Sequence, residues 1–245
     1  MRADTLPLQT HLRTRHEALR ARIDAAARRA GRDPSAVTLI AVSKTFPLAL
    51  IRAAVEAGLR DFGENRVQEL DEKAQALPGH AMDPASPDPI RWHHIGSLQR
   101  NKARTVCEVA DVFHALDSPR LARELDTRAR AVGRVLPCLV QVNVSGEASK
   151  SGLAPEDTLA FVDSLAAYEH LRPVGLMTLA APTRTEEELE SVVRPQFQRL
   201  RRLAEAAGRD RLPALSMGMS GDFEVAVEEG ATHVRIGSAL FGARG

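Results

Sequence analysis

The strongest constraint on the fold of this chain is a repeated alternation of short apolar runs with amphipathic segments. Eight short runs, most of them rich in valine, isoleucine, leucine and alanine, are typical of buried β-strands. Between them lie segments with apolar residues at three- and four-residue steps, which is the spacing of one helix face. This order, without an all-β or all-α block, indicates parallel strands joined by crossover helices. We predict the strands at 37–44, 59–65, 90–96, 111–116, 135–144, 171–179, 214–219 and 234–237.

The number of strand–helix units favours one architecture. Eight units within 245 residues are typical of a (β/α)8 TIM barrel, although a doubly wound sheet could hold the same number of strands. An amphipathic segment from Leu8 to Ala30, ended by Gly31, predicts one extra helix before the barrel. The proline-rich segment 78–90 predicts an exposed excursion that is too short to link two domains. We therefore expect residues 1–245 to form a single α/β domain.

Prolines mark several of the predicted helix boundaries. Pro47 and Pro155 stand where helices should begin, because a proline at the first helical position loses no hydrogen bond. Thr185 and Glu188 have the spacing of a capping box. Pro195 follows within the same predicted helix, so we expect that helix to kink or restart there.

The composition argues against several functional classes. Lys and Arg total 33 against 32 Asp and Glu, so no net field attracts nucleic acid or an anionic membrane. Aromatic residues make up 4% of the chain, too few for a surface on which bases stack. Cys107 and Cys138 lack the spacing of a disulfide framework or a metal site. Because no apolar signal core and no membrane-length apolar run is found, we expect a cytoplasmic protein.

A lysine closes the first predicted strand. The run that begins at Val37 ends at Lys44, and catalysis in a TIM barrel takes place at the carboxyl ends of the strands. A lysine in that position is costly to bury as a cation. It should therefore either extend its amine to water or have a lowered pKa and react as a neutral amine.

Two turns that contain glycine and serine close the last two predicted strands. Met217–Gly221 and Ile236–Ser238 lead into helix starts, where free backbone N–H groups favour a phosphate. A reactive lysine facing a phosphate site indicates a phosphorylated aldehyde bound as a Schiff base. Pyridoxal 5′-phosphate (PLP) fits this description, and so does a sugar phosphate bound by an aldolase. Arg235 shares a strand face with Gly237 and could reach the ring nitrogen of PLP, or it could form a salt bridge inside the barrel.

The remaining strand ends offer weaker candidates. The second strand ends at Glu64 and Asn65, and Glu64 could hydrogen-bond within the barrel mouth. His93 and His94 adjoin each other on the third strand and should point to opposite faces, so we do not expect them to ligate one metal together. Asp117 could act as an acid, but its place before a Ser-Pro pair is better explained as a helix cap. We predict no metal site.

Eight segments of the sequence form a long and specific set of motifs: Ala41–Thr45, Phe62–Glu69, Trp92–Lys102, Gln141–Val144, Ser149–Gly152, Gly175–Thr178, Ser216–Ser220 and Val234–Gly242. This set resembles the YggS/PROSC family of pyridoxal phosphate homeostasis proteins, over the chain from about Val37 to Arg244. The resemblance implies a single-domain, fold-type III version of the alanine-racemase barrel, with PLP, a form of vitamin B6, as its cofactor.

The resemblance also assigns roles to individual positions. It implies that Lys44 carries PLP as a Schiff base and that Arg235 is the partner of the ring nitrogen. Three positions depart from the family pattern: Arg66 and His94 stand where aromatic residues are frequent, and Phe46 stands where another lysine is frequent. The cofactor-binding residues are expected to be Lys44, Asn65, His94, Ser216, Ser220, Arg235, Gly237 and Ser238, with Lys150 and Met219 as secondary contacts.

Racemisation on this kind of barrel needs two bases, one on each face of the substrate. In the racemases that this chain resembles, the second base is a tyrosine from another domain of the partner subunit. We expect no such domain here, because the sequence ends at Gly245 directly after the eighth strand. The one tyrosine, Tyr168, precedes the sixth strand and so lies away from the strand ends. An arginine at the ring nitrogen also weakens the electron sink.

We therefore expect a PLP homeostasis protein that holds PLP and releases or transfers it, without robust amino-acid turnover. The expected partners are PLP and apo forms of PLP-dependent enzymes, with no nucleic acid and no membrane, and the expected state is a monomer. Two alternatives stay open: a PLP-dependent racemase or lyase for amino acids, and a Schiff-base aldolase for a sugar phosphate.

Overall fold

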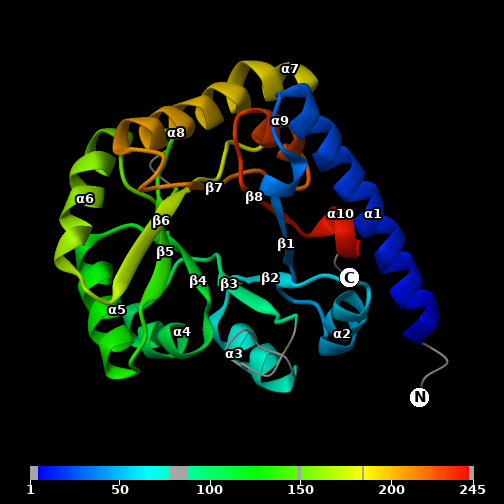
Figure 1. The fold of residues 1–245 in the computed structure, drawn as a ribbon, viewed down its shortest axis with the longest axis horizontal. Coiled ribbons are helices and arrows are strands. Elements are labelled where there is room, and N and C mark those ends of the chain that lie inside the picture. The colour runs from blue at the N-terminus through cyan, green and yellow to red at the C-terminus, as the bar shows by residue number, and fades with distance from the viewer. Residues whose placement is uncertain (1–4, 78–87, 148–149, 184, 243–245) are drawn as a thin grey trace.

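The computed structural model describes residues 5–77, 88–147, 150–183 and 185–242. Its eight parallel strands close into a barrel in chain order, with helices around the outside, so the predicted (β/α)8 architecture is confirmed (Figure 1). The barrel closes where β1 pairs with β8, from Thr38 opposite His233 to Ala41 opposite Ile236. The strands are β1 Thr38–Val42, β2 Asp61–Glu64, β3 Arg91–His94, β4 Val112–Leu116, β5 Leu136–Gln141, β6 Leu171–Met177, β7 Ala214–Ser216 and β8 His233–Ile236.

The helices that follow the strands cover the outer face of the barrel. A strand between this layer and the barrel interior is buried on both faces, which explains the mainly apolar sequences of β1, β4 and β5. The helices are α2 Leu48–Glu56, α3 Val67–Ala76, α4 Ala103–Val109, α5 Pro119–Ala131, α6 Thr158–Ser164, α7 Glu186–Glu188, α8 Arg194–Ala207, α9 Phe223–Glu228 and α10 Ser238–Phe241.

The extra N-terminal helix is also confirmed. This helix, α1, spans Thr5–Arg29 and lies against α2, α9 and α10 (Figure 1). Leu12, Leu19 and Ile23 are buried along its inner face. Helix α1 therefore completes the outer layer where the first and last strands meet.

A π-helical turn marks the predicted restart near Pro195. The capping box forms with both of its hydrogen bonds, between Thr185 and Glu188. The segment Leu189–Val193 is a π-helix, and α8 begins directly after it with Pro195 in its first turn. Proline has no N–H to donate to the preceding turn, and the wider π-turn accommodates the missing bond.

Part of the predicted proline-rich excursion, residues 78–87, lies outside the described residues. Within the described ranges, no helix is long and apolar enough to cross a membrane. Cys107 and Cys138 are both buried and free.

Candidate functional site

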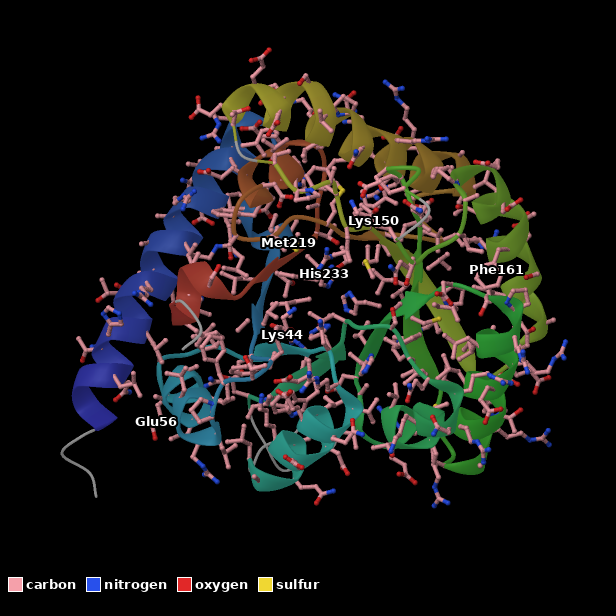
Figure 2. All side chains as sticks on the ribbon, turned by 180° about the vertical axis from the view of Figure 1, so that it is seen from behind. Lys44, Glu56, Lys150, Phe161, Met219 and His233 are labelled. Atoms are coloured by element: carbon pink, nitrogen blue, oxygen red, sulfur yellow. The ribbon has the colours of Figure 1, made fainter. Side chains whose placement is uncertain are left out.

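A pocket of about 320 Å³ opens at the carboxyl ends of the barrel strands, a size within the range of small-molecule sites. Figure 2 shows Lys44 and Met219 near the centre of the barrel, whereas Glu56 and Phe161 lie in the surrounding helices. Of the ten residues predicted to bind or neighbour a cofactor, seven line this pocket: Lys44, Asn65, Met219, Ser220, Arg235, Gly237 and Ser238.

The alternation of side chains after β1 directs Lys44 into the pocket. Val42 and Lys44 line the pocket, whereas Ser43 between them turns outward and donates a hydrogen bond to Glu64. The next residue, Thr45, has a φ of 67°, a left-handed conformation that residues other than glycine rarely adopt. Surrounding contacts must hold such a conformation in place.

The contacts that hold Thr45 come from α3. The carboxylate of Glu69 accepts a hydrogen bond from the Thr45 backbone N–H, with 2.6 Å between oxygen and nitrogen. Lys73, one turn later on α3, donates to Glu69 at 3.2 Å and to the carbonyl oxygen of Ser43 at 2.8 Å. Both chain neighbours of Lys44 are therefore attached to the same helix.

Lys73 also forms a buried ion pair with Glu64, at 2.7 Å. Glu64 is fully buried and Lys73 is 7% exposed. Burial raises the pKa of Glu64, and hydrogen bonds from Lys73 and Ser43 oppose that rise. Burial acts against ionisation of Glu69 as well, but the Thr45 N–H and Lys73 outweigh it and lower the pKa of Glu69. This cluster was not predicted from the sequence. The four-residue spacing of Glu69 and Lys73 was its one visible signal.

The loops after β7 and β8 form another wall of the pocket and are joined to each other. Gly218 has a φ of 95°, and its carbonyl oxygen accepts a hydrogen bond from the Arg235 backbone N–H at 2.9 Å. The Ser220 hydroxyl accepts one from the Ala239 N–H at 3.4 Å. Glycine and serine leave the backbone close to the pocket on this side, which suits an anionic group.

Arg235 is a buried cation beside that wall. It is 4% exposed and donates to the Ser216 hydroxyl at 2.6 Å and to the Thr178 carbonyl oxygen at 2.7 Å. These acceptors are neutral, so the alternative of a salt bridge inside the barrel does not describe its contacts. Burial lowers the pKa of Arg235 to about 10, opposed by nearby Asp222. The guanidinium therefore remains charged at neutral pH.

Three predicted residues do not line this pocket, and two of them, His94 and Ser216, are buried. His94 is buried and packs against Phe113, with 5.7 Å between the ring centroids. His93 turns into the barrel toward Asp61, so the two histidines point to opposite faces of β3, as predicted. Burial lowers the pKa of His94 to about 4, against a smaller opposing effect of the Gly96 backbone. Ser216 is fully buried behind Arg235 and does not line the pocket.

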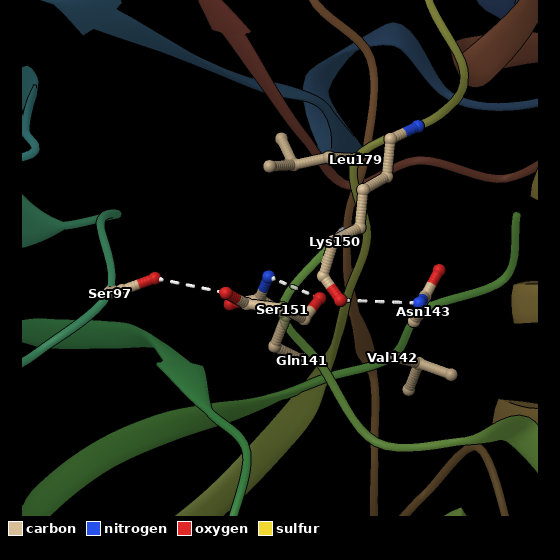
Figure 3. A pocket seen from close by; sticks show the side chains of 7 residues that line it. All are labelled: Ser97, Gln141, Val142, Asn143, Lys150, Ser151 and Leu179. Atoms are coloured by element: carbon tan, nitrogen blue, oxygen red, sulfur yellow. Dashed lines mark hydrogen bonds between the residues drawn. The ribbon is translucent and has the colours of Figure 1, made fainter. Parts of the chain in front are cut away.

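Lys150 lies in an adjoining pocket of about 250 Å³ that shares Leu179 with the first (Figure 3). Its amine donates to the Ala180 carbonyl oxygen at 3.2 Å and pairs with Glu147 at 2.8 Å. The structure therefore places the second lysine next to the main pocket and not in it. Among the described residues, no group of three or more His, Cys, Asp or Glu is placed to hold a metal ion.

Comparison with known proteins defines the class of this barrel. The family described as the alanine racemase N-terminal domain matches residues 15–245. An alanine racemase from Clostridium difficile 630 has a TM-score of 0.72 at 14% identity, covering 96% of this chain and 57% of that one, which shows a shared fold. The protein is thus a barrel of the alanine-racemase class.

Relatives with higher sequence identity show which family within this class the chain belongs to. The pyridoxal phosphate homeostasis protein of Pseudomonas aeruginosa is 46% identical over 224 residues, covering 91% of this chain and 92% of the relative. The protein of the same name from Escherichia coli K12 is 42% identical over 231 residues, covering 92% and 94%. The structure of PipY from Synechococcus elongatus PCC7942, with PLP bound, has a TM-score of 0.77 at 38% identity, covering 94% of this chain and 100% of PipY. This chain belongs to the family of pyridoxal phosphate homeostasis proteins.

Proposed function

We propose that this chain binds PLP in the pocket at the barrel mouth, as a Schiff base on Lys44, and serves PLP homeostasis by holding the cofactor and releasing or transferring it. One observation carries the proposal: Lys44, Arg235, Gly237 and Ser238 line one pocket of about 320 Å³. PLP in the structure of a relative with 38% identity supports the same ligand here.

The residues around the pocket fit this group. Ser220, Gly237 and Ser238 would hold the phosphate, and Asn65 would lie near the ring. PLP supplies a reactive aldehyde that an amine can capture and exchange. Arg235, as a cation at neutral pH, would keep the ring nitrogen unprotonated.

We also propose that the protein has no robust amino-acid turnover. The Tyr168 hydroxyl donates to the Pro119 carbonyl oxygen at 3.4 Å, and Tyr168 precedes β6, whereas the pocket lies at the carboxyl ends of the strands. From there it cannot act as the second base that racemisation requires. Exchange of the alanine α-proton into deuterated solvent tests this point. Rapid exchange would favour the alternative of a racemase or lyase.

We further propose that the protein is a cytoplasmic monomer in which residues 1–245 form one domain. In this proposal the protein transfers PLP to apo forms of PLP-dependent enzymes. Leu179 and Met219 are each 39% exposed although both line the pocket, and exposed apolar side chains suit contact with a recipient protein. The free cysteines suit a reducing compartment. Sedimentation of the purified protein tests whether it is a monomer. Reconstitution of an apo-enzyme by the PLP-loaded protein tests whether PLP is transferred to such a recipient.

Borohydride reduction of the PLP-loaded protein, followed by peptide mapping, tests the binding proposal. We expect a near-visible absorbance band that borohydride removes, with the phosphopyridoxyl group found on the peptide containing Lys44. Lys44→Ala should lack both signals, whereas Lys102→Ala, a lysine outside the pocket, should retain them. Absence of the band in the wild-type protein, or an adduct on another lysine, contradicts the proposal. Reduction in the presence of a sugar phosphate tests the aldolase alternative.

A further inference from the structure

A line of five side chains crosses the barrel interior from the pocket toward the amino-terminal ends of the strands. It runs from Arg235 on β8 through Ser216 on β7, His114 on β4 and His93 on β3 to Asp61 on β2. We propose that this line is a chain of hydrogen bonds with one direction, in which His114, His93 and Asp61 are positioning residues for Arg235. The inference rests on the proposed function, in which Arg235 is the partner of the PLP ring nitrogen.

In each link of the chain, the two polar atoms lie within hydrogen-bonding distance of each other. Arg235 Nη1 lies 2.6 Å from Ser216 Oγ, which lies 3.0 Å from His114 Nδ1. His114 Nε2 lies 2.9 Å from His93 Nδ1, and His93 Nε2 lies 3.1 Å from Asp61 Oδ1. None of the five residues is more than 8% exposed, so water does not compete for these bonds.

The direction follows from a count of donors and acceptors. Arg235 can only donate, so the Ser216 oxygen accepts. Within the chain, the hydroxyl hydrogen of Ser216 then finds an acceptor only if Nδ1 of His114 is bare. The proton of His114 is then on Nε2 and is donated to a bare Nδ1 on His93. His93 in turn donates its Nε2–H to Asp61, which accepts as a carboxylate. Every donor in the chain is satisfied while both imidazoles are neutral.

Arg91 fixes the lower end of the chain. Its Nε and Nη2 donate to the two oxygens of Asp61 at 2.7 and 2.6 Å. Burial would raise the pKa of Asp61, but His93 and Arg91 lower it to about 2, so the carboxylate is ionised. With both imidazoles neutral, the reversed direction would need a protonated Asp61, and it would also deprive the Ser216 hydroxyl hydrogen of its acceptor on His114.

A third histidine in the barrel interior serves as an internal reference. The ring centroid of His233 lies 6.1 Å from that of His114 and 6.3 Å from that of His93. Its Nδ1 lies 2.8 Å from the Thr232 hydroxyl oxygen, which is not part of the chain. A change in the chain should therefore alter the tautomers of His93 and His114 and leave the tautomer of His233 unchanged.

The proposed consequence of the chain is a fixed guanidinium. Ser216 presents its oxygen to Arg235 because its hydrogen is committed to His114, and the Thr178 carbonyl oxygen supplies the second acceptor at 2.7 Å. Arg235 is thereby held by two acceptors behind the face that lines the pocket. Preorganised donors of this kind need no rearrangement when a ligand binds.

The direction is tested on the PLP-free protein by two-bond ¹H–¹⁵N correlation spectra of the histidine rings at pH 7. We expect His93 and His114 each to carry one proton, on Nε2. A proton on Nδ1 of either ring overturns the proposal, and so does a doubly protonated ring. This result does not depend on whether the protein binds PLP, so it separates a failure of the chain from a failure of the proposed function.

The positioning role is tested with variants at the far end of the chain. Asp61→Leu removes the last acceptor, and we expect mixed tautomers of His93 together with PLP binding that is weaker by about threefold to tenfold. Asp61→Asn keeps an acceptor oxygen and should restore both the tautomers and the affinity to within about twofold of wild type. Asp111→Asn, which alters a carboxylate that accepts from the Trp92 backbone outside the chain, is the control.

Ser216→Ala provides a second variant, which cuts the chain beside Arg235 instead of at Asp61. We expect PLP binding weaker by about tenfold and a shifted near-visible band. If Asp61→Leu and Ser216→Ala both bind PLP like the wild-type protein, the positioning role is wrong. Failure of the wild-type protein itself to bind PLP would overturn the proposed function, while the tautomers would still decide whether the chain exists.

Discussion

The backbone N–H of Thr45 donates a hydrogen bond to the carboxylate of Glu69 over 2.6 Å, and Thr45 directly follows Lys44. The contact holds a residue with a φ of 67° against helix α3. Because Lys73 also binds the carbonyl oxygen of Ser43 at 2.8 Å, α3 holds the chain on both sides of the lysine. Helix α3 thus supports the position of the amine from outside the pocket, as a preorganised site requires.

Replacing Glu69 by alanine should loosen this attachment. The Thr45 N–H loses its acceptor, so we expect the free energy of unfolding to fall by about 1–2 kcal/mol. We also expect capture of PLP by Lys44, measured by borohydride trapping, to slow by about fivefold. Glu69→Gln keeps an acceptor oxygen and should recover most of the rate, and Glu72→Ala on the exposed face of α3 is the control. Equal trapping rates in Glu69→Ala and Glu72→Ala would show that the contact does not position the lysine.

Lys73→Met should destabilise the fold in a pH-dependent way. It leaves Glu64 buried without its cation, at a cost of about 3–5 kcal/mol at pH 7. The pKa of Glu64, which burial already raises, rises further, so the folded state binds a proton that the unfolded state does not. Stability from that proton is present at acid pH and is lost as the pH rises. We therefore expect urea unfolding to show a smaller deficit at pH 5 than at pH 7. A constant deficit contradicts this account, and Lys102→Met is the control.

Acid stability should depend on the pair of Asp61 and Arg91. The pKa of Asp61 is lowered from 3.8 to about 2, so its contribution is present above pH 4 and is lost as the pH falls toward 2. Arg91→Met should raise the pKa of Asp61 and shift acid unfolding to higher pH. We expect a loss of about 1 kcal/mol at neutral pH, since Arg91 is half exposed. Arg104→Met, which breaks the exposed pair with Glu108, should leave the acid transition in place.

The barrel and most of the pocket could be predicted because they depend on periodicity. Apolar runs alternating with amphipathic segments specify parallel strands and crossover helices, and a barrel brings all the carboxyl ends together. Lys44, Arg235 and Gly237 followed from that geometry, since each stands at or next to the end of a strand. The chemistry of Lys44 and Gly237 was visible because a lysine is costly to bury as a cation and glycine leaves backbone N–H groups free at a helix start.

The strand face on which a side chain lies, and its depth along the barrel axis, were harder to predict. His93 and His94 differ by one residue, and a one-residue change moves a side chain from one face of a strand to the other. His93 turns into the barrel, whereas His94, the predicted neighbour of the ring, packs against Phe113 on the other face. Ser216 lies behind Arg235, and sequence spacing does not measure depth along a barrel axis.

The buried polar clusters could not be predicted because their partners are far apart in the sequence. His114 and Ser216 are 102 residues apart and hydrogen-bond across the barrel interior. Lys73 is buried although it carries a charge, because Glu64 on a neighbouring strand supplies its counter-charge. Each such position becomes favourable only after the fold brings an acceptor to it.

Gly218→Ala should damage the wall of the pocket assigned to phosphate. A Cβ at Gly218 would lie 2.6 Å from the Ala226 Cβ and 3.0 Å from the Phe223 Cα, so the loop after β7 must shift. The Gly218 carbonyl oxygen accepts the Arg235 backbone N–H at 2.9 Å, and that shift would therefore pull on β8. We expect unfolding to become easier by about 2–4 kcal/mol, and inorganic phosphate to bind more weakly. Gly208→Ala separates steric contact from backbone strain, because Gly208 has a similar φ of 93° with nothing nearer than 4.0 Å to an added Cβ. If the two variants lose the same stability and bind phosphate equally well, contact with α9 does not shape this wall.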